Sequence, residues 1–348
     1  MSGRLKLRRG TVVGEQPLTV EIEGERRPAW ADVGLLGEMR EGDEIVVNTA
    51  ALDLGLGSGG FDVVHVNLTR GLTGGAAGDE HVTKLNYTSL QHPVDPVELP
   101  VSAIRDTDGE GTPEEAGGTI PVLVLPLHGH LAPAAWAAAQ AWPGLRLGYV
   151  QTGGGALPGS LSRDVAQLRE RGLLCGHVTA APAYGGEHES LSVAGALDAA
   201  AARLEWDAAL VGPGPGIIGS ETRLGHGGMA ALDGAHAALA LGMPAVLSPR
   251  LSAADPRERH RGVSHHTLTV LQMLLGPVEV AVPAGNPEIA ARLAGAGGGR
   301  HALREAPADL PGYAATNLPA RTMGRDIDQD PLFFAAALAA GAALRREE

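Results

Sequence analysis

From Thr119 onward, apolar runs alternate with helical patterns, and this alternation constrains the fold more than any other feature. The runs are short, uninterrupted and rich in Val, Leu and Ala: IPVLVLPL, LRLGYVQ, LLCGHVTA, AALVG, PAVLS and VEVAVP. Helical patterns follow them, beginning near Ala132, Ser160, Ser190, Gly228, Ser264 and Pro287. An apolar run without polar alternation is typical of a strand buried on both faces. Residues 119–348 are therefore predicted to form a Rossmann-like, doubly wound α/β domain with a mostly parallel sheet.

Residues 1–104 follow a different pattern, in a chain of 348 residues that is long enough for about two domains. Segments rich in Val, Ile and Thr are separated by turn residues, without helical patterns between them: RRGTVVGE, GDEIVVNTA and FDVVHVNLTRG. This pattern predicts a small β-barrel-like domain. The acidic, glycine-rich segment 105–118 is the predicted linker.

The connections in the α/β part are unequal in length. Turns from helix to strand are brief, whereas turns from strand to helix are long and polar, as in TGGGALPGSLS, GPGPGIIGSETRLGHGG and SPRLSAADPRERHRGVSHH. In a doubly wound sheet the strand-to-helix turns lie at the carboxyl edge of the strands, where ligands bind. We therefore expect a ligand site at that edge, near the junction with the β domain.

Two glycine-rich turns are candidates for binding an anion through backbone N–H groups and a helix start. The residues concerned are Gly153, Gly154, Gly155, Ser160, Gly214, Gly216, Ser220 and Thr222, with Ser162 as an alternative helix cap. A close backbone crossing with ordinary capping is the open alternative. Residues 214–219 also fit GxGxxG, but the loop continues to Gly228 and the next strand ends in LSPR without a carboxylate, which disfavours a dinucleotide site.

Charged and imidazole side chains occur in the same turns. Arg250 is a candidate anion ligand, on a loop that also carries Arg257, Arg259, His260 and Arg261; a solvated surface loop is the alternative.

Histidines offer a second chemistry at this edge. His128 and His130, with Glu189, are candidate metal ligands, although no complete ligand motif is present. His128, Glu189 and His226 are the catalytic candidates, with neutral His128 or His226 as a general base. Capping and loop hydrogen bonding by scattered histidines, among them His265 and His266, is the alternative.

The composition excludes several classes of protein. A net charge of −13 argues against a nucleic-acid binder and against an anionic-membrane binder. A single cysteine, Cys175, rules out an intrachain disulfide and a multi-cysteine metal site. No secretory signal is apparent, and the apolar C-terminal stretch is too short to span a bilayer. We expect a soluble cytoplasmic protein, with a homo-oligomer as an open alternative and the cofactor unknown.

Long strings in both parts of the chain carry a resemblance to a known family. They are VVNTAALDLGLGSGGFDVV, HVTKLNYTSLQ, GGALPGSLS, GPGIIGSETRLGHGG and TMGRDIDQDPLFFAAALAAG. In these strings the chain resembles a bacterial family known as domain of unknown function 3866. The resemblance implies a two-part member of that family and carries over no activity, cofactor or catalytic residue. TMGRD, 322–326, is a candidate to bring Arg325 and Asp326 to the ligand edge.

Three functions follow as hypotheses from these patterns. The leading hypothesis is recognition of a small anionic metabolite or nucleotide-like ligand, with or without turnover. The second is metal-assisted hydrolysis through His128, His130 and Glu189. The third is an assembly or interaction protein that uses the β domain as its partner surface.

Overall fold

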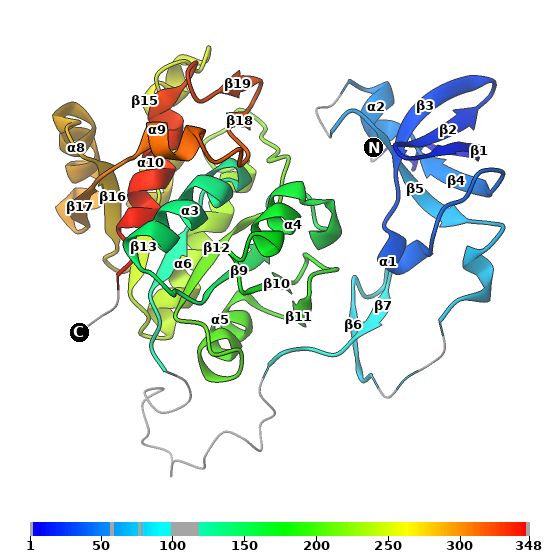
Figure 1. Ribbon diagram of the computed structural model, residues 1–348, viewed down its shortest axis with the longest axis horizontal. Coiled ribbons are helices and arrows are strands. Elements are labelled where there is room, and N and C mark those ends of the chain that lie inside the picture. The colour runs from blue at the N-terminus through cyan, green and yellow to red at the C-terminus, as the bar shows by residue number, and fades with distance from the viewer. Residues whose placement is uncertain (1–2, 56–58, 76–77, 79, 99–117, 346–348) are drawn as a thin grey trace, which may run out of the picture. The chain divides into compact units, whose positions relative to one another are not determined.

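The computed structural model describes residues 3–55, 59–75, 78, 80–98 and 118–345, which divide into two compact units (Figure 1). The units are Met1–Thr83 and Lys84–Glu348, so the first ends earlier in the chain than residue 104. The expected linker, 105–118, lies outside the described residues apart from Gly118.

The first unit contains a closed five-stranded barrel, as predicted. Its strands are joined in the order β1-β2-β3-β5-β4. Their bounds are β1 (Leu7–Glu15), β2 (Leu18–Ile22), β3 (Glu25–Trp30), β4 (Glu44–Asn48) and β5 (Asp62–Asn67). Alternate side chains point inward, and Val12, Val20, Ile45, Val47 and Val64 form the core. The short helices α1 (Val33–Leu36), α2 (Ala50–Asp53) and η1 (Gly71–Thr73) lie in the connections.

The second unit is built on an eight-stranded, all-parallel sheet, which confirms the predicted α/β class. The strand order is β11-β10-β9-β12-β8-β13-β16-β17. The strands are β8 (Val122–Val124), β9 (Leu147–Thr152), β10 (Gly176–Ala180), β11 (His188–Ser190), β12 (Ala208–Pro213), β13 (Ala245–Leu247), β16 (Glu279–Pro283) and β17 (Ala302–Ala306). The six apolar runs correspond to the six inner strands, whereas β11 and β17 form the two edges of the sheet.

Helices cover both faces of this sheet (Figure 1). They are α3 (Leu131–Ala141), α4 (Arg163–Glu170), α5 (Val193–Ala202), α6 (Ala230–Ala240), α7 (His265–Met273), α8 (Pro287–Ala294), α9 (Leu310–Ala314) and α10 (Pro331–Ala342). Successive strand residues face opposite layers. Leu123 and Leu210 pack with α3, α4, α9 and α10, whereas Val124 and Val211 pack mainly with α5, α6, α7 and α8. Burying such a side chain contributes about 1.5–3 kcal/mol to the free energy of folding. The helices packed on both faces therefore stabilise the sheet.

The alanine-rich C-terminal segment forms α10, which packs closely on α3. A side chain at Gly341 would place its Cβ 2.1 Å from the carbonyl oxygen of Ala134, so glycine permits the close approach. Most of α10 is buried, including Phe333 and Phe334. Within the described part of the chain, no helix has the length and apolar character needed to cross a bilayer.

Two short hairpins and several 3-10 turns complete this unit. The hairpins are β14 (Leu251–Ser252) with β15 (Gly262–Val263), and β18 (Arg321–Thr322) with β19 (Arg325–Asp326). The turns are η4 (His128–His130), η5 (Gly159–Leu161), η6 (Gly227–Met229), η7 (Glu258–His260) and η8 (Ala296–Gly299). Two further short strands are β6 (Val82–Lys84), within which the first unit ends, and β7 (His92–Val94). The η4, η6 and η7 turns follow β8, β12 and β13, whose parallel neighbours bring them to one edge.

Residues 84–98 fasten to the edge of the sheet through a buried lysine. The Nζ of Lys84 donates to the carbonyl oxygens of Thr179 (2.6 Å) and Ala183 (2.8 Å), and also to the carboxylate of Glu189. The other carboxylate oxygen of Glu189 accepts from the backbone N–H of Gly185 at 2.6 Å. Glu189 therefore has a structural role that accounts for both of its oxygens.

Replacing Glu189 by Ala is expected to destabilise the second unit by about 3 kcal/mol, because the buried ammonium of Lys84 loses its counter-charge. Glu187→Ala is the matched control, since Glu187 forms an exposed pair with Arg169 and its loss costs less than about 1 kcal/mol. Urea unfolding followed by tryptophan fluorescence measures both. Equal effects of the two variants would contradict the structural role of Glu189.

Candidate functional site

The glycine-rich turns after β9 and β12 cross each other at very short range. A Cβ at Gly155 would lie 2.1 Å from the carbonyl oxygen of Gly214, and one at Gly227 would lie 1.8 Å from that of Gly154. The backbone N–H of Ala156 also donates to the carbonyl of Pro215 at 2.7 Å. These glycines therefore serve the close backbone crossing, which was the open alternative to an anion site.

The other residues of these turns have local roles. A Cβ at Gly153 would lie 3.2 Å from the ring of Pro182, and Gly216 lies in an exposed bend at a φ of 72°. Ser220 bonds within its own loop, to Thr222 and to the carbonyl of Gly225.

The helix start after the first glycine turn is capped by Ser162. Its Oγ accepts from the N–H of Val165 at 3.1 Å, and Ser160 is exposed beside it. The cap of α4 is therefore the alternative residue, Ser162, and not Ser160.

His128 and His130 point to different partners. The carbonyl of Pro213, 3.2 Å away, accepts from Nδ1 of His128, so Nε2 accepts from the hydroxyl of Ser162 at 2.8 Å. His130 bonds through Nδ1 to the hydroxyl of Ser248 at 2.8 Å. Because Glu189 is held by Lys84, these residues do not form one ligand set.

Four imidazoles do gather at the carboxyl edge: His226, His260, His265 and His266. His260, His265 and His266 are the one set among the described His, Cys, Asp and Glu residues that could hold a metal, with one ligand atom of each within 4.8 Å of the others. The ring of His226 stacks on His266, with centroids 3.5 Å apart and planes at 6°.

Local folding explains this gathering. The turn after β13 doubles back as the β14–β15 hairpin and returns His260 to the start of α7, where His265 and His266 are the first helical residues. Ser264 caps that helix, accepting from the N–H of His266 at 3.2 Å, and it also bonds Nδ1 of His260 at 2.7 Å. One hydroxyl therefore fixes both the helix start and a histidine ring.

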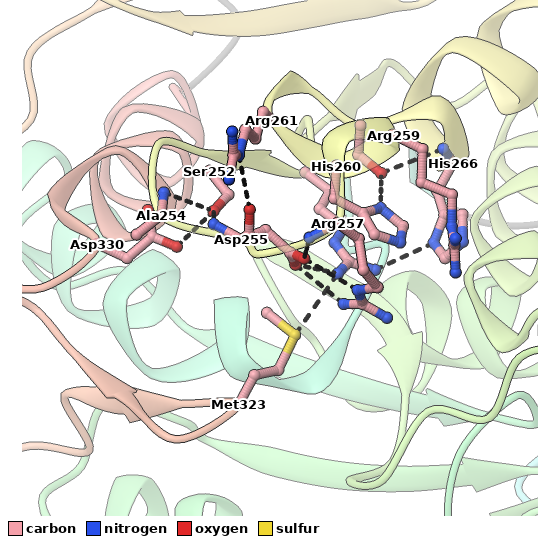
Figure 2. Close-up of polar contacts among 12 residues, drawn as sticks. Ser252, Ala254, Asp255, Arg257, Arg259, His260, Arg261, His266, Met323 and Asp330 are labelled. Atoms are coloured by element: carbon pink, nitrogen blue, oxygen red, sulfur yellow. Dashed lines mark hydrogen bonds and ion pairs between the residues drawn. The ribbon is translucent and has the colours of Figure 1, made fainter.

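A guanidinium cluster, defined as Arg250, Arg257 and Arg325, adjoins the imidazoles. Figure 2 shows Arg257 of this cluster with Asp255, close to His260 and His266. All three pair with the fully buried carboxylate of Asp255: Arg257 at 2.9 Å, Arg250 at 3.3 Å and Arg325 at 3.6 Å. Arg325 also pairs with Asp330 at 3.1 Å. Three cations thus face two carboxylates, which leaves local positive charge in an acidic protein.

Arg250 is the central member of this cluster. It is 5% exposed, and its side chain donates to Nδ1 of His266 at 3.2 Å and to the thioether of Met323 at 3.5 Å. Its Nε is buried without a hydrogen-bond partner. Burial lowers the pKa of Arg250 to about 10, so it stays charged at neutral pH.

The C-terminal TMGRD segment reaches this edge through the β18–β19 hairpin. Arg325 joins the guanidinium cluster, whereas the carboxylate of Asp326 accepts from the N–H of Gln329 at 2.9 Å. Asp255 and Met323 were not singled out in the sequence, and no spacing signal marks them. Arg259 is not part of this cluster and pairs instead with the exposed Glu221.

The imidazoles of the edge are held neutral. Burial, reinforced by neighbouring charges such as Arg250, lowers the pKa of His260 to about 3 and also lowers that of His265. Burial, together with the neighbouring His226 and Arg250, lowers the pKa of His266 to about 2. Neutral rings offer lone pairs, and fixed guanidiniums offer N–H donors, so the edge can bind a metal ion or an anion.

Two buried histidines elsewhere predict an acid-sensitive fold. Burial lowers the pKa of both His130 and His177 to about 3, against about 6.5 for a histidine in an unfolded chain. Below about pH 6.5 the unfolded state binds protons that the folded state excludes, so stability is complete above that pH and falls as the pH decreases toward 3.

We expect His177→Gln to reduce the slope of unfolding free energy against pH by about 1.4 kcal/mol per pH unit between pH 6 and 4. Urea unfolding at several pH values measures it, and His81→Gln, at an exposed histidine, is the control. An unchanged slope in His177→Gln would contradict a neutral buried ring.

The glycine crossing gives a separate test. Gly155→Ala is expected to destabilise the protein by about 2 kcal/mol, because the new methyl group overlaps a carbonyl of the opposite turn. Gly118→Ala is the control, since no atom lies within 4 Å of a Cβ there and its effect stays within about 0.5 kcal/mol. Thermal or urea unfolding measures the stability of both variants. Equal stabilities of Gly155→Ala and Gly118→Ala would contradict a close backbone crossing at Gly155.

Comparison with known proteins gives one match. A family model described as "Protein of unknown function (DUF3866)" matches residues 29–341, which include the candidate site and parts of both units. No curated protein and no solved structure matches the chain. The resemblance inferred from the sequence is confirmed, and the family description names no chemistry.

Proposed function

The chain belongs to the DUF3866 family of unknown function, and from the site itself we propose that its carboxyl edge binds a small anionic metabolite. The ligand carries a carboxylate or phosphate group, which the guanidinium cluster receives. Planar guanidiniums bind both groups through paired N–H donors.

The observation that carries this proposal is the buried, incompletely paired Arg250. Its Nε–H has no acceptor among the described residues, and the carboxylate that pairs with it, Asp255, is shared with Arg257 and Arg325. A buried donor without an acceptor costs about 1–3 kcal/mol. An anion at this position supplies the acceptor and balances the excess positive charge.

The fixed position of the guanidinium supports binding of a small ligand. Arg250 leaves the end of β13 with its N–H bonded to the hydroxyl of Thr267 at 2.8 Å, and its side chain is braced by His266 and Asp255. A side chain that is already ordered loses little conformational entropy when a ligand binds.

Removing a guanidinium should weaken anion binding about 10- to 100-fold, the equivalent of about 1.4–2.8 kcal/mol. Arg250→Gln tests the central group. Arg257→Gln tests the half-exposed guanidinium, whose loss leaves Arg250 and Arg325 paired with Asp255. Arg259→Gln is the matched control on the same loop, because Arg259 pairs with exposed Glu221 outside the cluster.

The measurement is isothermal titration with phosphate, phosphosugars, nucleotides and small carboxylates, together with urea unfolding of each variant. Binding that survives in both Arg250→Gln and Arg257→Gln would contradict the proposed site. So would the absence of binding by every ligand class at millimolar concentration.

A further inference from the structure

The geometry of the carboxyl edge points to a second ligand: we infer that His260, His265 and His266 bind one divalent transition-metal ion. Zinc, cobalt and nickel are the appropriate class, because imidazole nitrogen suits these ions and the set contains no carboxylate of the kind that magnesium or calcium needs. This inference uses the imidazoles alone and does not depend on the proposed anion.

The ligand atoms already lie near the spacing that a metal requires. One nitrogen of each ring lies within 4.8 Å of the other two. A zinc ion bound at about 2.0–2.1 Å by each imidazole holds its nitrogens about 3.4 Å apart in a tetrahedral site. Side-chain rotations that shorten these spacings close the set, and binding of a metal by His266 replaces the hydrogen bond that its Nδ1 accepts from Arg250.

The ring of His260 is oriented by a hydrogen bond at its Nδ1. Nδ1 of His260 lies 2.7 Å from the hydroxyl of Ser264, which is fully buried and caps α7. A histidine that binds metal through one nitrogen commonly donates from the other to such an acceptor, which fixes the ring and its tautomer. His260 is 1% exposed and is held in place by this contact.

Two other rings leave nitrogens without partners. Nε2 of His265 and Nδ1 of His226 are buried and have no hydrogen bond. The carbonyl of Arg223 accepts from Nε2 of His226 at 3.0 Å, so the unpartnered Nδ1 carries a lone pair. A metal ion at the trio satisfies His265, while His226 stays stacked on His266 and limits the movement of that ring.

The neighbouring charges define what else such a metal would bind. Arg250 donates to Nδ1 of His266, and Arg257 and Arg325 lie beside it on Asp255. The three histidines, being neutral, do not offset the charge of these guanidiniums or of a bound metal ion. Three protein ligands leave a coordination position open, as in catalytic rather than structural zinc sites. An anion or hydroxide in that position balances the charge of the metal and of the guanidiniums.

The test is metal titration of the full chain, without a histidine tag, after chelation and dialysis into a buffer free of phosphate and carboxylates. Zn²⁺ is titrated by calorimetry, and Co²⁺ by its visible absorption, whose intensity reports a low-coordinate nitrogen site. We expect one saturable site for each ion and none for Mg²⁺.

Variants locate the site. His265→Ala and His260→Ala are each expected to weaken Zn²⁺ binding at least about 10-fold. His81→Ala, at an exposed histidine of the first unit, and His236→Ala, on α6, should bind as the unaltered chain does. Urea unfolding accompanies each variant, and His265→Ala decides the question if the buried His260 position does not tolerate alanine.

Three results would overturn the inference. One is the absence of saturable Zn²⁺ and Co²⁺ binding at submillimolar concentration. The second is equal affinity in His265→Ala and the unaltered chain, and the third is loss of binding in His81→Ala or His236→Ala. Arg257→Gln separates this inference from the proposed function, because it should keep Zn²⁺ binding while anion binding weakens.

Discussion

The common direction of eight parallel strands is the constraint on which the candidate site depends. Because β12, β8 and β13 are neighbours in the sheet, their carboxyl ends bring the turns that carry His226, His128 and Arg250 to one edge. Successive side chains of these strands point to opposite faces of the sheet, and helices cover both faces. A shift of one residue in register would exchange the two sets of buried side chains, so the packing fixes the register. The core thus fixes the positions from which the polar turns start.

Two buried polar groups then convert that edge into an ordered arrangement. Asp255 pairs with two guanidiniums of its own loop and with the distant Arg325, and Ser264 links the cap of α7 to the ring of His260. Both groups also serve the fold: Asp255 lies in the turn after β14, and Ser264 starts a helix. The same contacts that complete the local structure therefore position the side chains available for chemistry, and little further ordering is needed when a ligand binds.

More of the fold than of the candidate site could be predicted from the sequence. The uninterrupted apolar runs predicted the inner strands correctly, whereas β11 (HES) and β17 (ALREA) are polar edge strands that lack that signal. The site depends on contacts between distant residues. Glu189 is paired with Lys84, 105 residues earlier, and the β14–β15 hairpin returns His260 to α7. His128 and His130, two residues apart, point to different partners because they lie on a 3-10 turn. Spacing alone contains none of this.

The protein has a net charge of −13 and yet carries a cluster of arginines. The two are compatible because salt limits the distance over which each charge acts. At physiological ionic strength an exposed charge is screened beyond about 8 Å, so distant carboxylates have little effect on a ligand at Arg250. Close to Arg250, the guanidiniums of Arg257 and Arg325 share the carboxylate of Asp255, Arg325 also pairs with Asp330, and the neighbouring imidazoles are neutral. We expect the overall acidity to disfavour polyanions such as nucleic acids, whose many phosphates must lie along an extended surface. A single small anion interacts mainly with the charges close to Arg250, whose sum is positive. We therefore propose that the charge distribution selects ligands by size as well as by the sign of their charge.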